Sequence, residues 1–223
     1  MDKRVEITNL IREQGLLPLY YHSDANLSVD VMEALYGAGC RVLEYTNRGE
    51  NALKNFEELR KKCDGLHGMY LGAGTIKDAA AANAFINAGA DFLVSPGLAE
   101  DVFDICYSEK ILWVPGCMTI TEIMKAEQFG IGFVKLFPGN LLGPSFVESV
   151  KEIFPSTSFI PTGGVDLEKE NLVAWFHAGV AAVGIGSKLV KKSLIEKREY
   201  KKLKAAAKNL LESIKDIRRA KEK

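Results

Sequence analysis

The segment QFGIGFVKLFP (128–138) indicates the fold, because three other segments of the chain share its form. Each segment finishes a helical pattern with a small residue and a glycine and then enters an apolar strand; the other three are YGAGCRVLEY (36–45), INAGADFLVSP (86–96) and FHAGVAAVGIG (176–186). A glycine after a helix supplies the left-handed cap before the next strand. The anchor glycines stand some forty to fifty residues apart, the length of two strand–helix units, at Gly39, Gly89, Gly132 and Gly179.

Four more apolar runs lie between these segments, at residues 16–21, 69–71, 111–114 and 158–160. Helical patterns fill the gaps, at residues 2–14, 27–38, 51–62, 77–88, 99–107, 119–129, 144–153 and 168–178. Strands that alternate with helices pair in parallel. Eight of them in just over 200 residues predict an α/β fold, a closed (β/α)8 TIM barrel. The competing fold, an open doubly wound sheet, would be expected to show GxGxxG after its first strand, but PLYYHSD (18–24) has no glycine.

The domain organisation is expected to be simple. No linker or low-complexity segment interrupts the chain, so residues 1–223 are predicted to form one barrel domain. An extra N-terminal helix is expected within residues 1–15. An amphipathic C-terminal helix is expected over residues 194–219, where it would close the barrel wall or touch a partner subunit.

Composition excludes several classes of function. The 29 basic and 29 acidic side chains balance, which leaves no electrostatic footprint for nucleic acid. No apolar run is long enough for a signal peptide or a membrane span. The four cysteines form no CxxC pair and fit free thiols in a reducing cytosol. We therefore expect a cytoplasmic protein. We also expect no metal, because the three histidines are too scattered for a recognisable metal triad.

Lys135 is the most informative residue of the opening segment. Alternation along a strand places it on one face with Phe133 and Phe137, while Val134 and Leu136 take the other face. Lysine is almost never fully buried unless it is paired or put to use. Apolar surroundings favour an uncharged amine, which is the nucleophile of Schiff-base chemistry. The alternative is an edge-strand lysine that reaches solvent.

Glu44 is the expected companion of Lys135. It alternates with Val42 and Thr46 on the second strand, and in such barrels each interior layer is filled by alternate strands. Strands 2 and 6 can therefore place a carboxylate and an amine in one layer near the mouth. A buried ion pair adds little stability, because desolvation offsets its attraction, so a functional pair is favoured. Arg48, just past the strand, could hold a substrate carboxylate with two hydrogen bonds, unless it is a plain surface arginine.

Two glycine clusters follow the strands that often build a phosphate site in barrels, the seventh and the eighth. They are Thr162-Gly163-Gly164 and Gly186-Ser187. Glycines expose backbone N–H groups to an anion, although each cluster alone would also suit a tight turn. Their occurrence after both strands predicts a site for a phosphate or a similar anion.

Taken in order, the strand-end motifs resemble the bacterial 2-keto-3-deoxy-6-phosphogluconate (KDPG) and 4-hydroxy-2-oxoglutarate (KHG) aldolases. The resemblance covers residues from about 5 to 210 and rests on seven motifs: Glu44–Arg48, Gly72–Thr75, Ser95–Gly97, Pro115–Gly116, Lys135–Pro138, Pro161–Gly164 and Gly184–Ser187. It implies a class I aldolase without cofactor or metal, usually a homotrimer. Such an enzyme cleaves a 2-keto-3-deoxy (phospho)sugar acid or 4-hydroxy-2-oxoglutarate to pyruvate and an aldehyde, either glyceraldehyde 3-phosphate or glyoxylate.

The same resemblance implies a role for each candidate residue. Lys135 would form the Schiff base and Glu44 would move protons. Arg48 and Thr75 would bind the keto-acid carboxylate, with Pro96 and Phe137 lining the pocket. The distal end of the substrate would be held by Thr162, Gly163, Gly164, Gly186 and Ser187.

Departures from the family pattern concern the pocket rim. Tyr20-Tyr21-His22 stands where relatives often carry an arginine, Gly49 stands where some carry a threonine, and Gly139-Asn140 follows Phe-Pro where relatives commonly have alanine. These changes concern the choice of substrate rather than the chemistry, and keto acids of the gluconate, galactonate and uronate pathways all remain open. Two other functions stay open, a phosphate-binding barrel isomerase or epimerase and a non-catalytic sugar-acid binding protein.

Overall fold

The computed structural model describes residues 2–221; Met1, which the prediction includes with the N-terminal helix, and residues 222–223 lie outside the described part. The strands are β1 (Leu16–Tyr20), β2 (Val42–Thr46), β3 (Tyr70–Gly74), β4 (Phe92–Val94), β5 (Leu112–Val114), β6 (Gly116–Cys117), β7 (Phe133–Leu136), β8 (Ser158–Pro161) and β9 (Val183–Ile185). The helices are α1 (Lys3–Gln14), α2 (Ala25–Ala38), α3 (Ala52–Cys63), α4 (Ala79–Asn87), α5 (Glu100–Ser108), α6 (Ile120–Gln128), α7 (Gly139–Ile153), α8 (Lys169–His177), α9 (Lys192–Glu196) and α10 (Tyr200–Lys221).

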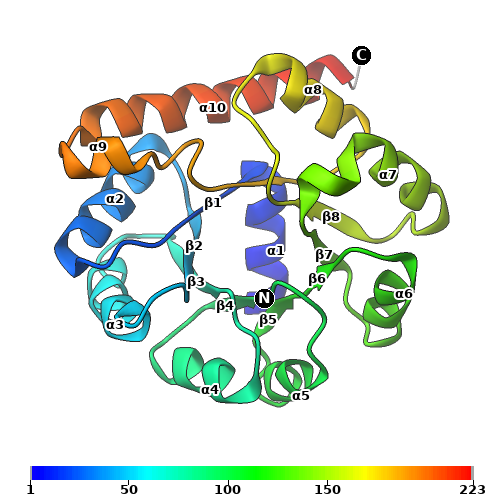
Figure 1. Ribbon diagram of the computed structural model, residues 1–223, viewed down its shortest axis with the longest axis horizontal. Helices are drawn as coiled ribbons and strands as arrows, with labels where there is room; N and C mark the ends of the chain where they lie inside the picture. The colour runs from blue at the N-terminus through cyan, green and yellow to red at the C-terminus, as the bar shows by residue number, and fades with distance from the viewer. Residues whose placement is uncertain (1, 222–223) are drawn as a thin grey trace.

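These strands form the predicted barrel of parallel strands (Figure 1). Two sheets run in the orders β5-β4-β3-β2-β1-β9 and β6-β7-β8. Only Pro115 separates β5 from β6, so together they act as one barrel strand, and the Lys135 amide donates to the Pro115 carbonyl at 2.9 Å. A parallel bridge between Thr162 and Gly184 joins the other two edges. Within the described residues, eight strand positions therefore close the ring.

Left-handed glycines end helices just before strands begin, as the repeated segments predict, but at one of the four segments the glycine is a different one. Gly39, Gly89 and Gly179 adopt left-handed φ angles of 109°, 88° and 99°. In the remaining segment the left-handed residue is Gly130, with φ 72°, and not the expected Gly132. Gly130 directly follows Phe129, the residue that caps α6, so the turn comes two residues earlier than the pattern indicates.

The predicted continuous helix over 194–219 is wrong in its extent. The structure has α9 and α10 separated at residues 197–199, where Arg198 takes a left-handed φ of 52°. Helix α7 begins before the predicted 144–153 and is kinked at Gly143, with Pro144 following. Helix α6 begins with a capping box, in which Thr119 and Glu122 exchange two hydrogen bonds between side chain and backbone. None of the described helices is long and apolar enough to span a membrane.

Two apolar layers hold the barrel together. Outward-facing residues such as Leu43, Val134 and Leu136 pack under the surrounding helices. Inward-facing residues form a separate cluster that includes Val42 and Phe133 together with Ile7 and Ile11 of α1. Helix α1 therefore closes the amino end of the barrel, and in Figure 1 it lies at the centre of the ring. The carboxyl end of the strands remains as the open mouth.

Candidate active site

Glu44 on β2 and Lys135 on β7 meet inside the barrel, as their alternation predicts. The Lys135 ammonium lies 3.7 Å from Glu44 Oε1, and the two side chains are 5% and 1% exposed. That distance exceeds a normal hydrogen bond, so the attraction between them is ionic. Neither Glu44 oxygen accepts a hydrogen bond from any described residue. A buried carboxylate without hydrogen bonds is costly to the fold, which points to a use beyond stability.

Gly74 makes room for the Glu44 carboxylate. A Cβ atom built at Gly74 would lie 1.9 Å from Glu44 Oε1, which no real side chain could tolerate. In the register of the sheet, Gly74 pairs with Thr46, two residues after Glu44, so the carboxylate bends toward the mouth. The glycine therefore fixes where the carboxylate can stand.

Lys135 is flanked by the two residues expected to line the pocket. Its ammonium lies 5.4 Å from the centroid of the Phe137 ring. Its strand partner is Gly116, and the Pro96 carbonyl lies 2.2 Å from the place where a Cβ of Gly116 would stand. Phe137 thus contacts the amine directly, and the Pro96 backbone lies one strand position away, beside Gly116.

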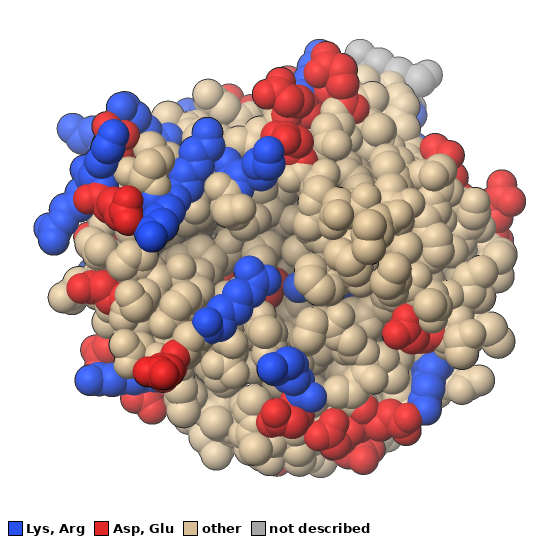
Figure 2. Space-filling model, in the orientation of Figure 1, with Lys and Arg blue, Asp and Glu red and all other residues tan. Residues whose placement is uncertain are grey.

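The candidate carboxylate-binding residues Arg48 and Thr75 leave neighbouring strands. The Asn47 amide donates to the Gly74 carbonyl at 2.7 Å, which ties the two strand ends together. Thr75 adopts a left-handed φ of 60°, a strained conformation for a β-branched residue and one typical of functional sites. Arg48 is exposed, so its guanidinium is free to reach a ligand at the mouth. Basic side chains flank the recess at the centre of this face in Figure 2.

The two candidate anion loops lie beside each other, because the Thr162–Gly184 bridge aligns the ends of β8 and β9. Gly163 and Gly164 have left-handed φ angles of 84° and 77°. Within the described residues, the amides of Gly164 and Ser187 donate no hydrogen bond. Free amides on adjacent glycine-rich loops are the donors that a phosphate needs. Gly186 packs against the backbone of β1, which places the second loop next to the first strand.

Tyr21 accounts for one departure from the family pattern. A Cβ atom at Gly49 would lie 2.2 Å from the Tyr21 hydroxyl, so the ring occupies the space that a side chain at position 49 would need. The same ring packs on Tyr45 at 5.8 Å. Tyr21 and Gly49 thus form a matched pair beside Arg48 on the rim.

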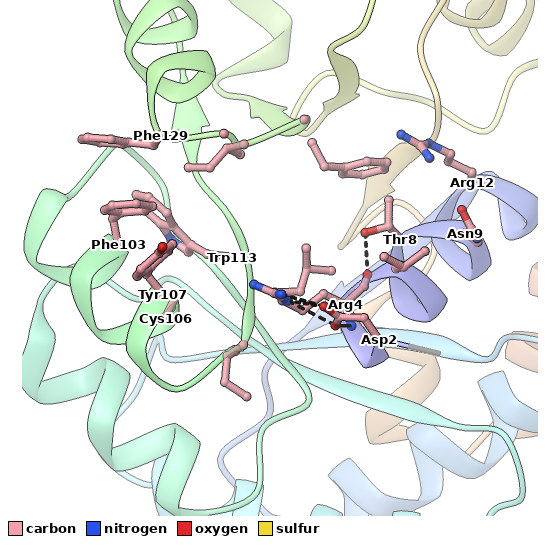
Figure 3. Close-up of a pocket in the computed structure, with 17 residues that line it drawn as sticks. Asp2, Arg4, Thr8, Asn9, Arg12, Phe103, Cys106, Tyr107, Trp113 and Phe129 are labelled. Carbon is pink, nitrogen blue, oxygen red and sulfur yellow. Dashed lines mark hydrogen bonds and ion pairs between the residues drawn. The ribbon is translucent and has the colours of Figure 1, made fainter.

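A pocket of about 530 Å³ lies at the opposite, amino end of the barrel (Figure 3). Aromatic residues such as Phe103 and Tyr107 form one side, and α1 forms the other. Its Arg4 guanidinium is already held by Asp2, and no candidate site residue lines it. The pocket is therefore separate from the Glu44–Lys135 pair.

The other reactive groups of the described residues form no second centre. Burial raises the pKa of the thiols to about 12 at Cys40, Cys106 and Cys117 and to about 11 at Cys63. Thiols that keep their protons are poor nucleophiles. In the part of the chain that the structure describes, no group of three His, Cys, Asp or Glu side chains could hold a metal ion.

The fold and the site define a (β/α)8 barrel enzyme with a lysine–glutamate pair at its mouth. The family model of KDPG and KHG aldolases matches residues 7–206, and the chain belongs to this aldolase family. A 2-dehydro-3-deoxy-phosphogluconate aldolase of Treponema pallidum is 32% identical over 212 residues, which cover 94% of this chain and 98% of the relative.

Solved structures agree with this assignment. A KDPG aldolase from Legionella pneumophila, with pyruvate captured as a covalent carbinolamine intermediate, has a TM-score of 0.83 at 25% identity and covers 91% of this chain and 97% of its own. The aldolase of Zymomonas mobilis ZM4 with 3-phosphoglycerate has a TM-score of 0.79 at 28% identity, covering 92% and 94%. The fold and the aldolase class are therefore both as expected from the sequence.

Two features of the site were missed by sequence reasoning. The role of Gly74 depends on the rotamer of Glu44, which no sequence pattern reports. The ion pair between Lys188 and Asp166 joins the two anion loops at 3.0 Å. Its only signal in the sequence is that each residue follows a glycine-containing strand end, and Lys188 is easily taken as part of the basic C-terminal surface.

Proposed function

We propose that this aldolase cleaves a 2-keto-3-deoxy sugar acid, phosphorylated at its distal end, or 4-hydroxy-2-oxoglutarate through a Schiff base on Lys135. The observation that carries the proposal is the buried pair of Lys135 and Glu44, whose carboxylate has no other described partner. The covalently captured pyruvate of the Legionella relative supports the same chemistry. The products would be pyruvate and an aldehyde, glyceraldehyde 3-phosphate or glyoxylate.

The reaction begins at the amine. The Lys135 ammonium passes a proton to Glu44, directly or through a water molecule, and the neutral Nζ attacks C2 of the keto acid. Glu44 returns this proton to the C2 oxygen, which leaves as water and gives the iminium. Glu44 then removes the proton of the C4 hydroxyl, directly or through a water molecule. The C3–C4 bond breaks, the aldehyde forms, and the bonding electrons move into the iminium to give an enamine. Protonation at C3 and hydrolysis release pyruvate and restore the amine.

Substrate binding is assigned to the rim. Arg48 and Thr75 hold the keto-acid carboxylate, and Pro96 and Phe137 exclude water around the reacting carbons. The free amides of the two glycine loops receive the distal group, together with Thr162. No metal and no cofactor is part of this assignment.

A homotrimer is the proposed assembly. Large apolar side chains are exposed beside α6 and at the start of α7, namely Met118 (41%), Ile120 (44%), Met124 (50%) and Leu141 (67%). The surface over α7 is largely free of charged side chains in Figure 2. An exposed apolar area of this kind is typical of a subunit interface. Sedimentation equilibrium measures the mass; a monomer at micromolar concentration would contradict the assignment.

Borohydride reduction in the presence of pyruvate, followed by mass spectrometry, tests the mechanism. We expect a reduced pyruvyl adduct on Lys135 in the native protein and none in Lys135→Ala, which should also lose cleavage activity. Glu44→Gln should keep part of the adduct while turnover falls by about 10²-fold or more. Wild-type turnover in either variant would remove the role assigned to that residue.

The family assignment favours the aldolase over the two other functions that the sequence leaves open. An isomerase or epimerase would use Lys135 only as a charge, and a binding protein would need no reactive amine. Both would give no adduct with pyruvate in the same experiment.

A further inference from the structure

Lys188 stands where the two anion loops meet. It directly follows Ser187 in the loop after β9, while Asp166 follows Gly164 by two residues in the loop after β8. Their side chains are 3.0 Å apart and 63% and 38% exposed. In Figure 1 the two loops cross the same side of the barrel mouth, as the Thr162–Gly184 bridge requires. The ion pair therefore joins the two loops that are proposed to hold the distal end of a substrate.

Asp166 is the fixed member of this pair. Its Oδ1 accepts a hydrogen bond from the Leu167 amide at 2.7 Å, and its own amide donates to Asn171 Oδ1 at 2.8 Å. Lys188 contributes a long side chain that is 63% exposed and whose ammonium pairs with Asp166. The hydrogen bond from Lys188 holds the pKa of the Asp166 carboxyl below its usual range, and the charge of Lys191 acts in the same direction. Lysine is thus the partner that can change position.

An exposed ion pair is weak, because water screens it and ordering two side chains costs entropy. A phosphate dianion next to the pair carries more charge than one carboxylate and offers more acceptor oxygens. The amides of Gly164 and Ser187 lie in the two loops that the Lys188–Asp166 pair joins, and both are available to such an anion. The Lys188 ammonium would then leave the Asp166 carboxylate, which carries one charge, and bind the phosphate, which carries two, without a change in the backbone.

We propose that Lys188 is a specificity residue that binds the distal phosphate of the substrate, and that Asp166 holds its ammonium at the rim until the phosphate arrives. This inference rests on the proposed function for the identity of the substrate, and it selects phosphorylated keto acids over unphosphorylated ones.

Three variants test the proposal in the full-length protein. Lys188→Met removes the ammonium and keeps the stem. Asp166→Asn removes the competing charge and keeps Oδ1 as the acceptor for Leu167. Lys192→Met is the matched control, because it also removes one positive charge nearby, but from an ammonium whose side chain is 84% exposed and paired with Glu196. Cleavage of 2-keto-3-deoxy-6-phosphogluconate and of 2-keto-3-deoxygluconate is measured for each.

Lys188→Met should lower kcat/KM for the phosphorylated acid by about tenfold, mostly through KM, as expected for the loss of one charge-assisted hydrogen bond. Its effect on the unphosphorylated acid should stay within about twofold on the same reasoning. Asp166→Asn should lower KM for the phosphorylated acid, and Lys192→Met should change neither substrate. Equal losses on both substrates in Lys188→Met, or a raised KM in Asp166→Asn, would overturn the proposal.

A binding measurement separates this proposal from the proposed function. Inorganic phosphate should raise the melting temperature of the wild type and of Lys192→Met, with a much smaller rise in Lys188→Met. If the borohydride adduct and cleavage are absent while this dependence on Lys188 is present, the phosphate site stands and the aldol chemistry does not. If the adduct forms but Lys188→Met binds phosphate as the wild type does, the chemistry stands and the role of Lys188 is wrong.

Discussion

Replacing Lys135 by methionine tests whether the pair at the barrel mouth is charged and dry. Methionine keeps most of the lysine stem but leaves the Glu44 carboxylate without the cation that lies 3.7 Å away. Two unit charges at about 4 Å attract by about 4 kcal/mol at an effective dielectric of about 20. Breaking a buried pair on one side costs about 3–5 kcal/mol, because the remaining charge stays desolvated. We therefore expect Lys135→Met to be destabilised by about 4 kcal/mol.

Urea denaturation and thermal melting measure this loss. For a chain of this size each kcal/mol shifts the melting temperature by about 2–4 °C, so a drop of about 8–16 °C is expected. The double variant Lys135→Met/Glu44→Met replaces the pair with apolar side chains of similar length. It should recover most of the loss or exceed the wild type, because exchanging a buried pair for apolar residues is often neutral or stabilising. It should also be inactive.

Two results would refute this reasoning. Wild-type stability in Lys135→Met would mean that the carboxylate is hydrated or already neutral. A double variant as unstable as the single one would assign the loss to packing and not to an uncompensated charge. The exposed Lys192→Met serves as the control and should melt with the wild type.

Three further predictions concern the same molecule. Gly74→Ala should lower turnover by about 10²-fold or more, because its Cβ displaces the Glu44 carboxylate, whereas a Cβ in Gly132→Ala meets nothing within 4 Å and should leave activity unchanged. Arg48→Met should raise KM for the keto acid by about tenfold or more through loss of the proposed contact with the substrate carboxylate, with a smaller change in kcat, in steady-state assays. The buried thiols, whose pKa is raised by burial from 9.0 to about 11–12, stabilise the fold fully below pH 9. As the pH rises from 9 toward 12, these thiols ionise only in the unfolded chain, so each should lower the free energy of unfolding by about 1.4 kcal/mol per pH unit. Urea titrations measure this loss, and a constant free energy of unfolding over that range would contradict the burial of the thiols.

The barrel could be predicted from the sequence because its glycine caps and apolar runs are local signals. Alternation along β2 and β7 then placed Glu44 and Lys135 in one interior layer, since a strand offers only two faces. The pattern was less reliable where a turn could form at either of two glycines, as at Gly130 and Gly132. It also failed at Arg198, where a residue other than glycine takes the left-handed conformation that ends α9.

Contacts between side chains from distant loops could not be predicted in this way. The pair of Lys188 and Asp166 depends on the bridge between Thr162 and Gly184, which aligns two loops whose own sequences carry no mark of each other. The same holds for Tyr21 and Gly49, where the phenol of one fills the space that the other leaves. In the sequence, the departures from the family pattern at Tyr21 and Gly49 look unrelated. The fold shows that they depend on each other, because the Tyr21 ring needs the space that Gly49 leaves empty.

The closed amino end of the barrel gives the site its direction. Ile7 and Ile11 of α1 pack against the lowest interior layer, so a ligand can reach Lys135 only from the carboxyl end of the strands. In the proposed reaction, a keto acid entering from that side places its reacting carbon at the amine and leaves its distal end at the rim. The free amides after β8 and β9 lie at that rim. The reacting carbon therefore lies deep in the barrel and the distal group lies at its rim. For this reason a change at Lys188 is expected to alter substrate choice, and a change at Glu44 is expected to alter the chemistry.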